Sequence, residues 1–164
     1  EIFFPENLAY EDIIWGELLH LYAERVFIGR MRLYHYFINP EATVLGRASA
    51  YHPDMLTIHS RFYHEVRRRG LDTEYETELE YEYLYTGLLA FLKILALRFE
   101  EPPYSLFLLL QAFTEEHYPN LRDNYYVKRD GLPPVHDNLL QAAFMPLRKK
   151  EFLELMASLK KIGI

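Results

Sequence analysis

The chain has 164 residues, a length that suits one domain with one hydrophobic core. Half of its residues are hydrophobic and none is cysteine, so disulfides, thiolate zinc sites, iron–sulfur clusters and thiol nucleophiles are excluded. Its formal net charge of −6 disfavours a surface built to neutralise nucleic-acid phosphates and leaves such binding to a local basic patch.

Hydrophobic periodicity predicts a mainly α protein, a single-domain bundle of about five to six helices over residues 1–164. The first helix is predicted over residues 8–37, where Trp15, Leu18 and later apolar residues recur at helical spacing. A second helix is predicted over residues 54–69, because it follows a proline, carries one apolar face and stops at a glycine.

Residues 74–85 nearly alternate glutamate with aromatic residues, which is the period of a strand. Glutamate, however, favours helices over strands, and no glycine or proline interrupts the chain before Gly87. One long helix running on to Phe99 is therefore the favoured interpretation. A short strand or hairpin at 74–83 or at 125–128 is the alternative.

Three further helices follow along the chain. Residues 104–117 come after two prolines and are apolar nearly all round, which predicts the central, buried helix of the bundle. A short helix is predicted over 137–144, where an aspartate or asparagine can cap it, and a last amphipathic helix over 152–163. No span of the membrane is expected, because Lys93 and Arg98 interrupt the most apolar stretch.

One group of residues has the spacing of metal ligands. Glu17, His20 and Glu24 share one ridge of a helix, and the Glu-x-x-His spacing is the one used by carboxylate-bridged di-iron bundles. His59 lies on the apolar side of its helix and is a candidate fourth ligand. A helical-bundle enzyme with iron or another divalent metal is therefore an alternative function, although the sequence requires no cofactor. The simpler interpretation is a solvated helix face and a buried, hydrogen-bonded histidine.

The helix at 54–69 is the one locally basic element of this acidic chain. Arg61, His64, Arg67 and Arg68 cluster on and beside its outward side, which makes nucleic-acid binding a second alternative. A more modest interpretation is that Arg67, Arg68 and Arg69 complement the dipole at the C-terminal end of the helix and pair with the glutamates that follow.

The favoured function is a protein-interaction or assembly module, which binds a partner protein or a second copy of itself and carries out no chemistry. Tyrosine is abundant here and is enriched at protein interfaces, and the basic helix is followed by an acidic stretch. The absence of cysteine fits a reducing, cytoplasmic compartment. The residues predicted to bind the partner are Arg61, His64, Arg67, Arg68, Glu74, Glu78, Glu82, Tyr81, Tyr125 and Tyr126.

Overall fold

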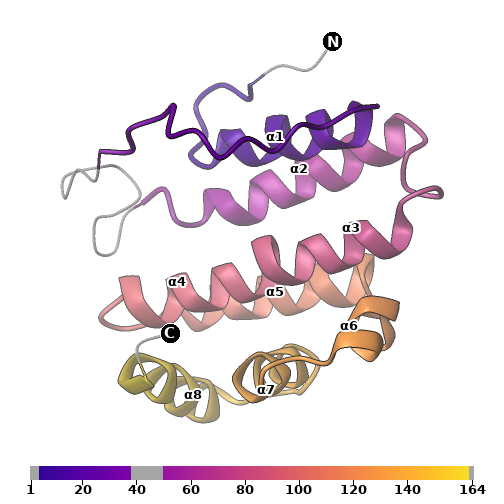
Figure 1. Cartoon of the computed structure of the whole chain (residues 1–164). Coiled ribbons are helices and arrows are strands. Elements are labelled where there is room, and N and C mark those ends of the chain that lie inside the picture. Colours follow the sequence, from indigo (N-terminus) through magenta and orange to yellow (C-terminus); the bar gives the residue numbers. More distant parts are fainter. Residues whose placement is uncertain (1–3, 38–49, 163–164) are drawn as a thin grey trace.

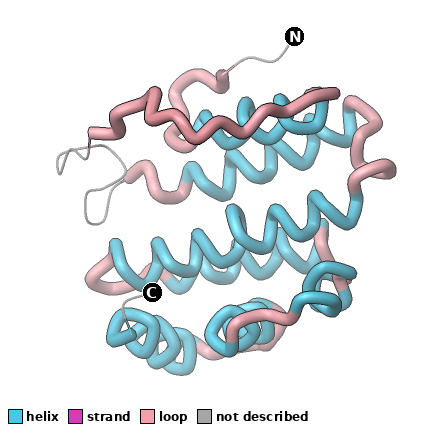
Figure 2. Tube along the Cα trace, viewed as in Figure 1, coloured by secondary structure: helices cyan, strands magenta, loops and turns pink. Residues whose placement is uncertain are grey.

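The computed structural model describes residues 4–37 and 50–162, in which every regular element is helical (Figures 1 and 2). The elements are α1 (Glu11–Tyr22), α2 (Asp54–Arg68), α3 (Glu76–Glu82), the π-helix η1 (Tyr83–Leu89), α4 (Ala90–Arg98), α5 (Tyr104–His117), the 3₁₀ turn η2 (Leu121–Asp123), α6 (Tyr125–Asp130), α7 (Pro134–Ala143) and α8 (Lys149–Ile162). Since α3, η1 and α4 form one continuous helix, the described residues contain seven helices. The mainly α fold is confirmed, and the strands considered at 74–83 and 125–128 are wrong.

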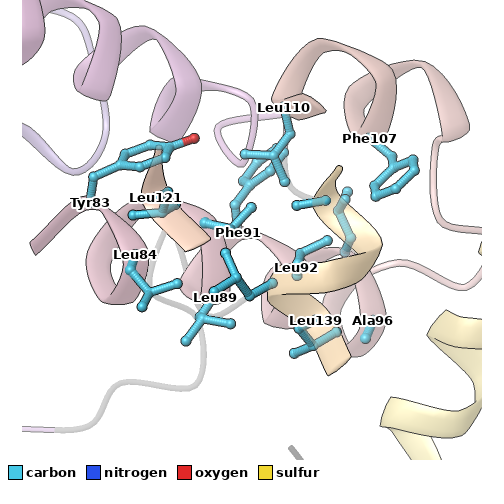
Figure 3. Packing of buried hydrophobic residues seen from close by; sticks show 14 of the residues in the cluster. Tyr83, Leu84, Leu89, Phe91, Leu92, Ala96, Phe107, Leu110, Leu121 and Leu139 are labelled. Carbon is cyan, nitrogen blue, oxygen red and sulfur yellow. The ribbon is translucent and has the colours of Figure 1, made fainter. Parts of the chain in front are cut away.

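The continuous helix α3–η1–α4, called the central helix below, is the element around which the others pack. Figure 1 shows α1 and α2 on one side of it, α5 beside it, and α7 and α8 on the opposite side. It contacts α2, α6, α7 and α8. Its buried residues, which include Leu84, Phe91 and Leu92, form the main core with Phe107 of α5 and Leu139 of α7 (Figure 3).

The bounds predicted for α5 are confirmed, but its predicted place at the centre of the bundle is wrong. Phe107 and Leu110 are fully buried, whereas Leu108 and Leu109 are 45% and 58% exposed. The helix therefore covers the core with one face, although its sequence is apolar on both. Among the described residues, no helix has both the length and the apolar character needed to cross a membrane.

Gly87 lies where the central helix widens into its π-helical turn. Such turns leave room for a neighbouring side chain to insert. Here His59 of α2 reaches the turn, and its Nε2 donates a hydrogen bond to the carbonyl oxygen of Thr86 at 3.0 Å. A Cβ atom on Gly87 would overlap the ring of Tyr83 and would lie 3.4 Å from Cε1 of His59. The missing side chain at Gly87 thus leaves room for the ring of Tyr83, against which the ring of His59 packs edge-on at a centroid distance of 5.6 Å.

The predicted first helix ends fifteen residues early, at Tyr22 instead of Phe37, and residues 24–37 belong to no helix or strand. α1 is stabilised by packing on α2 in a second, smaller core, to which α1 contributes Ile14 and Leu18. The two helices end together, where Nη1 of Arg69 donates a hydrogen bond to the Tyr22 hydroxyl at 3.3 Å. Beyond that point, none of the described helices packs against residues 24–37, and short helices are marginal without tertiary packing.

Residues 125–128, where a strand was the alternative, instead form the start of α6, which begins at a side-chain cap. Oδ1 of the buried Asn124 accepts a hydrogen bond from the backbone N–H of Tyr126 at 3.0 Å, which starts α6, and Gly131 with φ +70° ends it. α7 begins at Pro134, three residues before the predicted cap, because proline suits the first turn of a helix. α8 begins at Lys149, and the predicted end at Gly163 lies outside the described residues.

Replacing Gly87 by alanine is expected to destabilise the protein by about 1–3 kcal/mol, the usual effect of overpacking a core. Gly16→Ala on α1 is the matched control, because nothing lies within 4 Å of the added Cβ. That control should stabilise the protein by about 0.5–1 kcal/mol, since alanine is the better helix former. Urea unfolding of both variants measures the two effects. Equal or greater stability of Gly87→Ala would show that the Tyr83 ring does not need the space beside Gly87.

Candidate functional site

The structure does not bring the predicted metal ligands together. Among residues 4–37 and 50–162, no three histidine, aspartate or glutamate side chains are arranged to hold a metal ion. His20 and Glu24 are exposed, while His59 is buried between α2 and the central helix. Burial lowers the pKa of His59 to about 4, so its imidazole is neutral at pH 7 and its Nε2 proton is bound to the Thr86 carbonyl. The simpler interpretation of His59, a buried histidine with a hydrogen bond, is confirmed.

Glu17 faces another carboxyl group rather than a histidine. Its half-buried side chain on α1 hydrogen-bonds to Glu82 of the central helix. Burial, followed by the charge of Glu82 and the hydrogen bond between them, raises the pKa of Glu17 to about 7. The proton that Glu17 retains lets its carboxyl group lie against that of Glu82 without a cation between them.

The arginines of α2 are paired within the chain. Nη2 of Arg68 and Nη2 of Arg69 each lie 2.6 Å from Oε1 of Glu65. Nε of Arg67 lies 3.6 Å from Oδ2 of Asp72, and its Nη1 donates to the Tyr63 hydroxyl at 2.7 Å. The predicted pairing with the glutamates that follow is therefore wrong for these three arginines. Their acceptors are Glu65 and Asp72, not the glutamates of 74–82.

The remaining residues of the basic face differ in their surroundings. Arg61 is exposed on α2. His64 is exposed as well, with its ring 5.5 Å from that of Tyr63 and 6.0 Å from that of His117 on α5. The histidine therefore borders an aromatic cluster, while Arg61 faces solvent.

Several of the predicted partner-binding residues converge where α3 meets α6. The ring of Tyr81 lies 5.3 Å from that of Tyr126, and Tyr125 lies 5.3 Å from Tyr126 on the other side. The Tyr126 hydroxyl donates a hydrogen bond to Glu78 at 2.5 Å. Glu82 instead faces α1 through Glu17, and Glu74 precedes the first turn of α3. Only Tyr125 in this cluster is a largely exposed aromatic side chain, at 60%.

Residues 24–37, called the exposed tract below, form an apolar surface that sequence analysis missed. Its large hydrophobic side chains are between 63% and 90% exposed and belong to neither hydrophobic core. They are Val26, Phe27, Ile28, Met31, Leu33, Tyr34, Tyr36 and Phe37. The β-branched and aromatic composition of this run, with a glycine inside it, was the signal for an extended segment.

α1 presents a second apolar surface, called its outer face below. Trp15, Leu19 and Tyr22, which share one side of the helix, are 38%, 44% and 47% exposed. Phe4 stacks on Trp15 with ring centroids 5.4 Å apart and is itself half-exposed. α1 therefore buries only the side that faces α2, and its outer face directly precedes the exposed tract in the sequence.

A pocket opens between α2, the start of the central helix and the end of α5. It has a volume of about 300 Å³ and is lined by apolar, aromatic and charged side chains. Phe62 and Val66 of α2 lie on one side, and His117 and Tyr118 lie on the other. The pocket differs from the exposed tract because its walls are already packed, so it suits a small ligand better than a protein surface.

Replacing Glu17 by glutamine is expected to stabilise the protein at pH 8 and to have no effect at pH 4. The folded chain holds the Glu17 proton more tightly than the unfolded chain, in which its pKa is near the ordinary 4.5, so stability falls as pH rises between about 4.5 and about 7. Glutamine removes this loss, which for a half-buried group amounts to about 1–2 kcal/mol.

Urea unfolding at the two pH values measures this difference. Glu24→Gln is the control, because Glu24 is exposed beyond the end of α1 and its replacement should change stability at neither pH. A Glu17→Gln protein no more stable than the natural one at pH 8 would contradict the retention of this proton by Glu17.

Comparison of the chain with models of protein families, with curated proteins and with solved structures finds no match. The function must therefore be inferred from the chain's own side chains. Two features are candidates for a binding site. One is the apolar surface formed by the exposed tract and the outer face of α1, and the other is the pocket between α2, the central helix and α5.

Proposed function

We propose that this chain is a helical protein-interaction module, which binds a partner protein through the exposed tract and the outer face of α1. The observation that carries the proposal is the run of eight large hydrophobic side chains in the tract, each at least 63% exposed. Contiguous apolar surfaces of this kind are rare on monomeric proteins and mark sites of protein association.

The backbone of the exposed tract suits binding by strand addition. Its residues belong to no helix or strand, and no backbone hydrogen bond joins them to other described residues. Such a segment can add a strand to the edge of a partner's sheet, where its N–H and C=O groups would be satisfied. Alternate residues of a strand point to opposite sides. Phe27, Met31, Leu33 and Phe37 would then share one mainly apolar side, on which His35 and, at its start, Arg25 are the polar residues.

The charge of the exposed tract predicts a second property of the partner. Arg30, Arg32 and Tyr34 alternate with the apolar residues and would lie on the opposite side of the added strand. Together with Arg25 they make the tract basic within a chain whose formal net charge is −6. The preferred partner therefore has an apolar sheet edge or groove with acidic groups at its rim, and these groups would speed encounter.

The double variant Met31→Asp/Leu33→Asp is expected to lose partner binding without losing the fold. Burying two hydrophobic side chains contributes about 3 kcal/mol or more, so affinity should fall over about a hundredfold. Because neither residue belongs to a described core, thermal unfolding should shift by less than about 0.5 kcal/mol. The matched control is Leu108→Asp/Leu109→Asp on α5, which changes two exposed leucines outside the tract and the outer face of α1 and should retain the affinity.

Two measurements test association. Sedimentation of the purified chain tests binding to a second copy, and affinity purification with cross-linking, comparing the natural chain with both variants, tests binding to another protein. The proposal would be overturned if the natural chain stays monomeric and cross-links to no protein more strongly than the Met31→Asp/Leu33→Asp variant does.

A further inference from the structure

The pocket between α2, the central helix and α5, called the amine pocket below, has a polar group that the fold does not satisfy. Tyr118 is only 6% exposed, yet its hydroxyl makes no hydrogen bond to another described residue. Its ring stacks on that of Tyr83 at 4.1 Å, and the Tyr83 hydroxyl is paired with Thr114 at 2.7 Å. Among the described side chains, Nδ1 of His136 is the only fully enclosed polar atom without a partner, so the unpaired Tyr118 hydroxyl opens into the pocket, where a ligand can reach it.

The charges around the amine pocket are unbalanced. Asp72, Glu76 and Glu80 line it, while Arg67 is the only lysine or arginine among its lining residues. Arg67 is already bound by Asp72 and by the Tyr63 hydroxyl. Among the described residues, neither Glu76 nor Glu80 has a lysine, arginine or histidine within ion-pair distance. Two carboxylates therefore face the pocket without a cation.

Glu80 shows that this imbalance has an energetic cost. Burial, and then the charge of Glu76, raise the pKa of Glu80, whereas a hydrogen bond from Nδ2 of Asn124 at 3.1 Å acts in the opposite direction. The nearby His117 does not supply the missing charge. Burial lowers the pKa of His117, so its ring, stacked 4.2 Å from that of Tyr63, is neutral at pH 7.

We propose that the amine pocket binds the primary ammonium group of a small alkylamine, either a free amine or the side chain of a lysine. The ammonium group donates hydrogen bonds to Glu76, Glu80 and the Tyr118 hydroxyl and places a positive charge between the two carboxylates. Its alkyl chain lies on Phe62, Val66 and Leu79, as apolar stems of lysine do elsewhere.

The size and donor set of the pocket favour an organic cation over a metal. A volume of about 300 Å³ is at the lower end for small-molecule sites and large for a bare ion. The described carboxylates and histidines form no group of three that could coordinate a metal. Tyr63 and Tyr118 add aromatic rings, which attract organic cations.

The test titrates the full chain with n-butylammonium chloride and follows the amide resonances of α2 and α3. Saturable shifts with a Kd of about 1 mM are expected, since two or three such contacts give roughly 4 kcal/mol. Sodium chloride at the same ionic strength serves as the reference for screening. Failure of butylammonium to saturate, or identical shifts with sodium chloride, would overturn the proposal.

Three variants locate the ligand. Glu76→Gln, Glu80→Gln and Tyr118→Phe should each weaken butylammonium binding at least about fivefold. Glu115→Gln, an exposed glutamate of α5 that does not line the pocket, should leave the affinity unchanged. Tyr118→Phe keeps the ring that stacks on Tyr83, so the fold is retained. Equal affinity of all four variants and the natural chain would place binding elsewhere and overturn the proposal.

A second probe distinguishes the two sources of the amine. If acetyl-Gly-Lys-Gly-amide binds about tenfold more tightly than butylammonium, the ligand is a lysine of another protein. If the two affinities are equal, the ligand is a free amine. Either result supports the pocket. The amine pocket shares no residue with the exposed tract, so this experiment and the test of protein association succeed or fail separately.

Discussion

The fold depends on the close packing of α2 against the π-helical turn of the central helix. His59 and Gly87 meet there, and the hydrogen bond from His59 to Thr86 satisfies a carbonyl group in the wide turn. α2 also carries the smaller core that holds α1, so the same contact joins the α1–α2 pair to the rest of the bundle. The outer face of α1 and the amine pocket both keep their positions through α2.

Local signals in the sequence predicted most of the helices. α2, α5 and α8 each combine an apolar face with a clear boundary, such as Pro53 or Gly70 at the two ends of α2. The exposed tract could not be predicted in the same way. Periodicity shows where a helix could bury a face, but it does not show whether another helix lies opposite, and none does beyond Tyr22.

The acidic stretch illustrates why the candidate sites needed the structure. The sequence presents its five glutamates as one charged patch, whereas three of them meet different neighbours: Glu78 binds Tyr126, Glu80 binds Asn124 and Glu82 binds Glu17. The meeting of Tyr81 with Tyr126 and the unsatisfied hydroxyl of Tyr118 both arise from elements distant in the sequence. Spacing along a single helix carries no information about either.

Glu17 and His59 together have a consequence for the electrostatics of folding. At a pH near 5.5, the unfolded chain carries a negative charge on Glu17 and a positive charge on His59, whereas the folded chain holds both groups neutral, because their pKa values move to about 7 and about 4. Folding in effect transfers a proton from the imidazole to the carboxyl group. The two charges disappear together, so these two shifts leave the net charge at this pH unchanged while the contacts of α1 and α2 with the central helix lose both charges.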